Sequence, residues 1–152
     1  MLRDQLNTAL KEAMKAKDEV GLRTLRLILA ALKDRDIAAR PSGNTEGIGP
    51  DEILGMLQSM IKQRHDSIEM YKQGNREDLA ASEAAEVSVI TQFLPTQLSD
   101  DEIADAVAAA IAEIGADSIK DMGKVMGSLK SRYAGQMDFG KAGQLVKAAL
   151  AS

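Results

Sequence analysis

LPTQLSDDEI, residues 94–103, predicts the point at which this chain passes from one helical part to another. Pro95 ends the preceding helix, because the residue before a proline is disfavoured in the helical conformation. Ser99 then begins a new helix as its N-cap residue, and Glu102, three positions later, completes a capping box. We therefore expect two domains. Their expected bounds are 1–95 and 96–152.

The apolar residues of the chain recur at spacings of three and four, which is the pattern of amphipathic helices. Four such patterns precede Pro95 and three follow it, and no alternating strand pattern competes. The sequence therefore predicts an all-α fold, with an N-terminal bundle of about four helices and a C-terminal three-helix bundle. The expected helix boundaries are Asp18, Gly74, Gly115, a second capping box at Ser118 and Asp121, Gly135, and Asp138. The run PSGNTEGIGP at 41–50 predicts a flexible loop, because it holds two prolines and three glycines.

Composition narrows the class of protein. The chain of 152 residues contains no cysteine, which excludes disulfides, thiolate metal ligands and a cysteine nucleophile. No apolar run approaches the roughly 20 residues of a membrane-spanning helix. The first residues lead into an amphipathic pattern rather than a signal peptide. We expect a soluble, cytoplasmic protein that does not associate with membranes.

Charge is distributed unevenly along the chain. Residues 1–40 hold nine Lys or Arg and six Asp or Glu, and residues 117–152 hold six and three. Residues 41–98 hold four bases and nine acids, and residues 99–116 hold five acids and no base. Two basic segments therefore flank an acidic middle. This arrangement permits local contact with an anionic partner, although the net charge is −4.

Two glycines occupy the sixth predicted helix, in DMGKVMGSLKSRYAGQMDFGK at 121–141. A glycine inside a helix costs about 1 kcal/mol relative to alanine, so Gly123 and Gly127 require a reason. In helical projection they lie beside an apolar stripe, on the flank that carries three lysines. The stripe consists of Ile119, Met122, Met126, Leu129 and Tyr133, and the lysines are Lys120, Lys124 and Lys130. Two explanations stay open: a phosphate backbone that lies against the helix between the lysines, or close packing against another helix.

Three charged residues fall within apolar helix faces. Arg64 lies in the middle of the apolar face of the third predicted helix, and Glu83 and Glu86 lie in the middle of that of the fourth. Unpaired charge inside a core is prohibitive, so we expect these side chains to form a structural ion pair. Acid–base work by the two carboxylates is disfavoured, because the arginine would keep both ionised.

No signature of a catalytic site appears in the sequence. The metalloprotease, P-loop, nucleophile-elbow and dinucleotide-binding motifs are absent, and no cluster has the spacing of metal ligands. His65, the single histidine, has no second ligand or nucleophile near it in the sequence. Arg23, Arg26 and Lys33 flank the leucine stripe of the second predicted helix, where we expect their stems to cover the edge of the core. We expect no catalytic residue, no metal and no cofactor.

Three blocks of the chain together resemble the GatB/YqeY family. They are TLRLILAALKDRDI at 24–37, the block from IKQRHDSIEMY to LSDDEI at 61–103, and MGKVMGSLKSRYAGQMDFGKAGQLVKAAL at 122–150. The likeness is greatest to the small stand-alone YqeY-like proteins. Residues 122–150 are also similar to the C-terminal domain of the B subunit of the glutamine-dependent aspartyl/glutamyl-tRNA amidotransferase.

The resemblance implies an all-helical protein of two parts that associates with tRNA. In the amidotransferase the tail domain helps to hold tRNA while other domains perform the chemistry. The family label is carbon–nitrogen ligase activity with glutamine as amido-N-donor, yet this sequence shows no counterpart of the kinase-like domain or of the amidase subunit. We therefore expect an accessory module that binds tRNA beside amidotransferase subunits or an aminoacyl-tRNA synthetase, and whether it is itself an enzyme stays open. The alternative is a helical protein–protein interaction module without RNA binding.

The residues expected to contact RNA combine the glycine–lysine pattern with the resemblance. The pattern of the family tail matches Gly123, Lys124, Gly127, Lys130, Asp138, Gly140, Lys141 and Lys147. The full set expected to bind RNA is Lys120, Gly123, Lys124, Gly127, Lys130, Arg132, Lys141 and Lys147.

Overall fold

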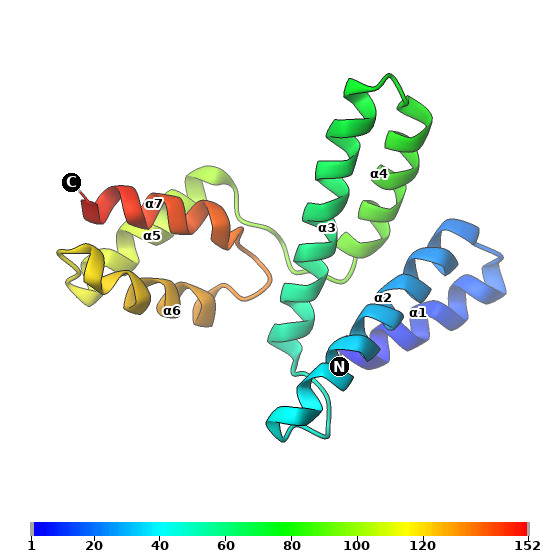
Figure 1. Cartoon of the computed structure of the whole chain (residues 1–152), viewed down its shortest axis with the longest axis horizontal. Coiled ribbons are helices and arrows are strands. Elements are labelled where there is room, and N and C mark those ends of the chain that lie inside the picture. The colour runs from blue at the N-terminus through cyan, green and yellow to red at the C-terminus, as the bar shows by residue number, and fades with distance from the viewer. Residues whose placement is uncertain (1, 152) are drawn as a thin grey trace. The chain divides into compact units, whose positions relative to one another are not determined.

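The computed structural model describes residues 2–151, and every regular element in that range is helical (Figure 1). The α-helices are α1 (Leu2–Ala16), α2 (Glu19–Ala39), α3 (Pro50–Gln73), α4 (Glu77–Thr91), α5 (Asp100–Ile114), α6 (Met122–Arg132) and α7 (Phe139–Ala151). Two short 3-10 turns, η1 (Arg40–Ser42) and η2 (Ile119–Asp121), follow α2 and precede α6. The expected all-α fold, with four helices before Pro95 and three after it in the sequence, is confirmed.

The chain divides into two compact units, residues 1–94 with α1 to α4 and residues 95–152 with α5 to α7. Each unit has its own core, because the helices of each turn their apolar stripes inward. In the first unit α3 packs along α4, and α2 packs against both α1 and α4 (Figure 1). In the second unit α5, α6 and α7 pack pairwise. The side chains with almost no exposed surface include Leu6, Ile28, Leu57 and Ile90 in the first unit and Val125, Leu129, Met137 and Val146 in the second.

Local capping chemistry explains where several helices begin and end. At the start of α5 the Ser99 hydroxyl accepts from the Glu102 amide at 3.1 Å, and the Glu102 carboxylate accepts from the Ser99 amide at 3.0 Å. The predicted capping box is therefore confirmed. Asp18 and Asp138 also accept backbone hydrogen bonds at the starts of α2 and α7, as expected. Gly115 ends α5 in the left-handed conformation, with φ +72°.

The start and the end of α6 differ from the prediction. The Ser118 side chain makes no capping hydrogen bond, and Asp121 Oδ2 instead accepts from the Asp117 amide at 3.2 Å. The prediction of a second capping box is therefore wrong, because η2 separates Ser118 from the α-helix. Ile119, which lies in that turn, is 48% exposed and does not belong to the apolar stripe. The helix also ends before Gly135, which has φ +76° in the turn that follows.

The loop at 41–50 makes specific contacts with α1 and α2, which its composition did not indicate. Arg3 donates to Asp36 at 2.7 and 2.8 Å and to the Ile48 carbonyl at 2.8 Å. The Ile48 amide donates to Asp36 at 2.9 Å, and the Ile48 side chain is buried. The hydrogen bonds from Arg3 lower the pKa of Asp36 to about 2. Composition missed this because the partners come from α1 and α2, far from the loop in sequence.

Candidate nucleic-acid interface

The two glycines of α6 lie on the solvent side of the helix. Gly123 and Gly127 are exposed, and a Cβ atom built at either position would meet no other atom within 4 Å. The core side of α6 is formed by Val125 and Leu129, which lie opposite in helical projection. The structure therefore does not use these glycines for packing between the helices of this bundle.

Lysines surround the glycines on that side of α6. In helical projection Lys130, Gly123, Gly127 and Lys124 follow one another over about 120° of the helix surface, and all four are exposed. Lys120 lies in η2, at the N-terminal end of the same helix, and is also exposed. None of the three lysines makes an ion pair with an acid within the described residues. The pKa of Asp121 is lowered chiefly by the hydrogen bond from the Asp117 amide, and the charge of Lys124 adds to this effect.

The adjoining flank of α7 contributes a fourth lysine. A Cβ atom built at Gly143 would lie 3.9 Å from the terminal methyl groups of Met122 and Met126, so this flank of α7 turns toward α6. Lys147 follows Gly143 by one helical turn and is exposed on the same flank. We call the exposed surface of Lys120, Gly123, Lys124, Gly127, Lys130 and Lys147 the glycine–lysine face.

Two residues of the expected set do not lie on the glycine–lysine face. Arg132 is 2.7 Å from Glu113 of α5, and this hydrogen bond raises the pKa of Arg132 and lowers that of Glu113. Lys141 lies 3.0 Å from Asp100, and that hydrogen bond raises the pKa of Lys141. Both cations lie on the side of the bundle formed by α5, where acidic partners already balance their charge.

The N-terminus of α7 is likewise occupied by a carboxylate. Asp138 accepts from the Gly140 amide at 2.9 Å and from the Lys141 amide at 3.2 Å. These amides are the donors that a helix N-terminus would otherwise offer to a phosphate. Asp138 and Gly140, which match the family tail, therefore shape the helix start and are not placed to bind an anion through these amides.

A small group of charged residues in the first unit joins three helices through ion pairs. Arg64 of α3 donates to Glu86 of α4 at 2.9 Å, and Glu83 lies 4.0 Å from the same guanidinium. Arg23 of α2 donates to the other oxygen of Glu86 at 3.2 Å. We call Arg23, Arg64 and Glu86 the three-helix clasp.

Sequence reasoning missed Arg23 as a member of the clasp. Its side chain was expected only to cover the edge of the core. The available signal was the charge balance, because two central carboxylates faced a single central arginine and a second cation was needed.

His65 is exposed, and no group of three or more metal-ligating side chains occurs within residues 2–151. No helix among those residues is long and apolar enough to span a membrane.

Comparison with known proteins finds one matching family model and several similar fungal proteins. The family model described as Yqey-like protein matches residues 3–150. Three fungal proteins named "Altered inheritance of mitochondria protein 41, mitochondrial" are similar to it. The relative from Pyrenophora tritici-repentis is 33% identical over 135 residues, covering 84% of this chain and 71% of the relative.

The two yeast relatives match a shorter part. The protein from Vanderwaltozyma polyspora is 37% identical over 89 residues, 59% of this chain and 46% of the relative. The protein from Saccharomyces cerevisiae is 36% identical over 87 residues, 56% of this chain and 44% of the relative. The matched part thus spans less than half the length of these two relatives.

Proposed function

The chain belongs to the YqeY-like family, and from this premise we propose that it binds tRNA through the glycine–lysine face, as an accessory module without chemistry of its own. Amidotransferase subunits or an aminoacyl-tRNA synthetase are the proposed protein partners. The proposed role rests on the face itself and on the likeness of residues 122–150 to a tRNA-holding tail domain.

The observation that carries the proposal is the open surface at Gly123 and Gly127. Each glycine gives up roughly 1 kcal/mol of helix stability, and neither returns it through a contact inside the bundle. A phosphate backbone could approach the helix closely over the two glycines. The lysines on either side would then neutralise its charge. Phosphate contacts of this kind supply affinity and position the ligand without reading bases.

Fluorescence anisotropy with labelled bulk tRNA tests the proposal. Contacts from four lysines to about four phosphates would weaken binding by roughly 50- to 150-fold between about 50 and 200 mM salt. The double variant Lys124→Glu and Lys130→Glu should lose binding while it retains its helical circular dichroism. Its matched control is Lys62→Glu with Lys72→Glu, two exposed lysines of α3, which should bind as the unchanged protein does.

Two outcomes would contradict the assignment. If no tRNA binds at low salt, the glycine–lysine face is not an RNA surface, and a protein–protein interaction module becomes the better description. If both double variants lose affinity equally, the binding is a general effect of charge. Glutaminase or transamidation activity of the isolated chain would overturn the accessory role.

We also propose a cytoplasmic location, which the cysteine-free composition permits. The fungal relatives carry the word mitochondrial in their names. Fractionation of cells that express the tagged protein would decide between a cytoplasmic and an organellar location for this chain.

A further inference from the structure

The two helices that form the glycine–lysine face contain no acidic residue. Neither α6 nor α7 has an aspartate or a glutamate anywhere in its length. Asp117 and Asp121 lie beside Lys120 in the sequence, and Asp138 lies just before α7. Asp121 and Asp138 accept backbone hydrogen bonds at these helix starts. The surface that α6 and α7 contribute to the face is therefore uniformly positive.

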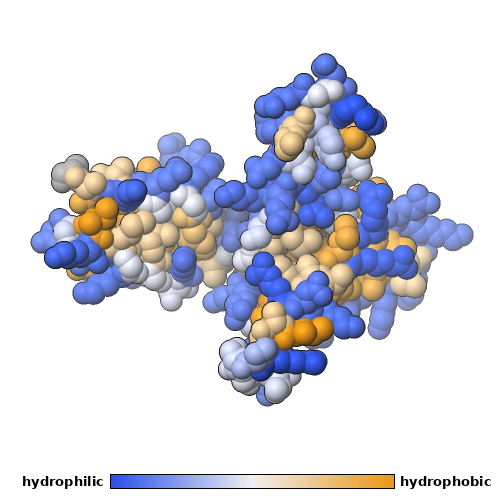
Figure 2. Space-filling model, in the orientation of Figure 1, coloured by the Kyte–Doolittle hydropathy of each residue, from blue (hydrophilic) through white to orange (hydrophobic). Residues whose placement is uncertain are grey.

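The outward side of α2, in the other basic segment of the chain, carries charges of both signs. In helical projection Arg26 and Lys33 share this side with Glu19 and Asp34, and all four are exposed. Figure 2 shows apolar surface among hydrophilic side chains where α2 crosses the first unit. A long anionic backbone would meet repulsive as well as attractive groups here.

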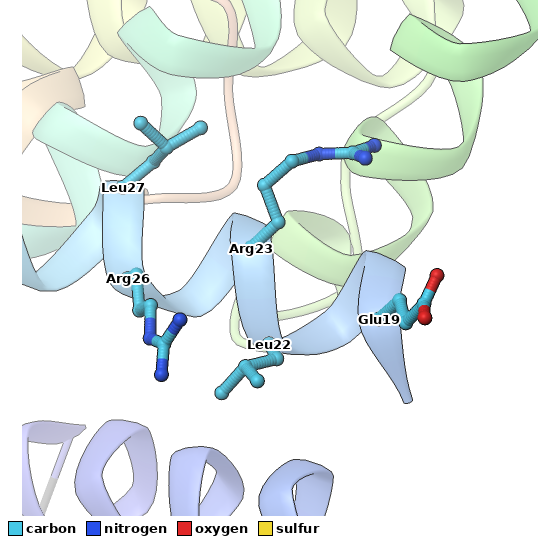
Figure 3. Close-up of a pocket in the computed structure, with 5 residues that line it drawn as sticks. All are labelled: Glu19, Leu22, Arg23, Arg26 and Leu27. Carbon is cyan, nitrogen blue, oxygen red and sulfur yellow. The ribbon is translucent and has the colours of Figure 1, made fainter. Parts of the chain in front are cut away.

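An open depression on α2 does not gather cations either. Its volume is about 370 Å³, and it is lined by Glu19, Leu22, Arg23, Arg26 and Leu27 (Figure 3). In Figure 3 the Arg23 side chain extends toward α4, whereas Arg26 extends away from it, toward α1. Arg23 is also bonded to Glu86. The glycine–lysine face is therefore the better surface for an extended row of phosphates.

The lysines of α6 and η2 cover a length that suits several phosphates. Lys120 and Lys130 are ten residues apart, which is about 15 Å along a helix axis. Each strand of a nucleic-acid duplex carries one phosphate per about 3.4 Å of its axis. The row of lysines thus extends along about four phosphates of one strand.

The side chains of the second unit that can stack on a base are engaged elsewhere. Tyr133 and Phe139 are its two aromatic residues, and both are partly buried and pack against its core. Its one arginine, Arg132, is bonded to Glu113. Proteins that bind single-stranded RNA stack unpaired bases on aromatic rings or on arginine planes. Lysine is a point charge that contacts phosphates without stacking.

A duplex and a single strand differ in what they lose on binding. A flexible strand loses conformational freedom when it is fixed against a surface, and stacking is the interaction that compensates for this loss. A duplex is already ordered, and its backbone forms much of the surface that it presents. Contacts from lysines, with close approach over Gly123 and Gly127, therefore suit a rigid backbone better than a flexible one.

We propose that the glycine–lysine face binds the backbone of a double-helical RNA segment, such as a stem of tRNA, without reading its bases. This inference rests on the proposed binding of tRNA and specifies which part of an RNA the face contacts. The lysines supply the affinity, and the glycine surface lets the riboses and phosphates lie close to α6.

Anisotropy titrations of the full chain with labelled RNAs test this inference. The probes are bulk tRNA, an RNA duplex of about 12 base pairs, which is longer than the row of lysines, and an unstructured single strand with the same number of phosphates. At about 50 mM salt the duplex should bind about tenfold more tightly than the single strand, because each of four lysines releases more counterions from a duplex. A second duplex of unrelated sequence should bind within about twofold of the first.

The outcomes separate this inference from the proposed function. A single strand that binds as tightly as the duplex would overturn the inference, and so would a tenfold difference between the two duplexes. If tRNA binds but neither duplex does, the face contacts unpaired nucleotides, so the inference fails while the binding of tRNA stands. If none of the RNAs binds, the proposed function fails as well.

Two variants locate the contact on the chain. Tyr133→Leu keeps an apolar side chain against the core but removes the ring, and it should leave the affinity for every probe within about twofold. A tenfold loss of tRNA affinity in this variant, with helical circular dichroism retained, would reveal stacking and contradict the inference. Gly123→Leu with Gly127→Leu should weaken the duplex at least about tenfold, whereas the matched pair Gly123→Ala with Gly127→Ala should weaken it less than about threefold. A leucine pair that binds the duplex as the unchanged protein does would place the backbone elsewhere.

Discussion

A single carboxylate, Glu86, joins three helices of the first unit. Its side chain is 11% exposed, and that of Arg64 is 13% exposed, whereas half of the Arg23 side chain faces solvent. The two ion pairs of the three-helix clasp therefore differ in energy. Truncation of a buried partner leaves an uncompensated charge, whereas an exposed pair is worth little.

We expect Arg64→Ala to lower the free energy of unfolding by about 3–5 kcal/mol, because it leaves Glu86 largely buried with only the exposed arginine. Arg23→Ala should cost less than about 1 kcal/mol. Urea unfolding followed by circular dichroism measures both. Arg76→Ala, which removes the exposed pair with Asp78, is the control and should have almost no effect. Equal losses for Arg23 and Arg64 would contradict the difference in burial.

The Arg3–Asp36 pair predicts a dependence of stability on pH. The pKa of Asp36 is lowered to about 2 from its usual 3.8, chiefly by the hydrogen bonds from Arg3. A carboxyl whose pKa is lower in the folded state stabilises the fold above its unfolded pKa, and this stabilisation is lost as the pH falls through the folded value. The advantage of the unchanged protein over Asp36→Asn in urea midpoint should thus be full at pH 6 and shrink between about pH 4 and pH 2. A constant difference across that range would show that Asp36 acts through shape alone.

At the scale of single residues, the sequence predicts which face of a helix a residue lies on. It predicts less well which other side chain that residue contacts. The central placement of Arg64, Glu83 and Glu86 follows from helical periodicity alone. The contact of Arg23 with Glu86 does not, because it depends on how far α2 lies from α4. The same holds for Asp36, whose partners in α1 and in the loop come together only in the folded unit.

Helix α6 shows how a short 3-10 turn alters a whole element. Projection at 100° per residue includes Ile119 in the apolar stripe, but η2 turns more tightly and places Ile119 outside it. Val125, absent from the predicted stripe, is fully buried. The glycine positions survive this shift, because Gly123 and Gly127 lie within the regular helix.

The exposed glycines of α6 predict opposite effects on stability and on binding. Gly123→Ala with Gly127→Ala should raise the free energy of unfolding by about 1–2 kcal/mol, since alanine favours helix and each Cβ atom enters open space. Gly123→Leu with Gly127→Leu should keep the fold but weaken tRNA binding at least about tenfold. Thermal unfolding and anisotropy measure the two effects. If the alanine pair destabilises the protein, the glycines serve packing after all.

On the scale of the whole molecule, the packing of the helices separates the cations that are paired with acids from those that are not. All five acids of residues 99–116 belong to α5, and two of them, Asp100 and Glu113, pair with Lys141 and Arg132 on that side of the second unit. The unpaired lysines remain on α6, η2 and α7. The net charge of −4 therefore hides a basic face, which segment-by-segment counting of the sequence indicated. Counting could not tell which cations were already paired, because pairing depends on the packing of α5.

The presence of two separate cores predicts that the parts of the chain can be tested alone. Residues 95–152 bury Val125, Leu129, Met137 and Val146 without help from the first unit. A domain of about 60 residues is marginal, so this fragment should unfold cooperatively but at a lower temperature than the full chain. It should retain salt-dependent tRNA binding within about threefold of the full chain, because the whole glycine–lysine face lies within it. The fragment 1–94, which lacks that face, is the control and should bind little tRNA. If the fragment 1–94 binds tRNA as well as the full chain does, the basic N-terminal segment must carry the contact, and the glycines of α6 need another explanation.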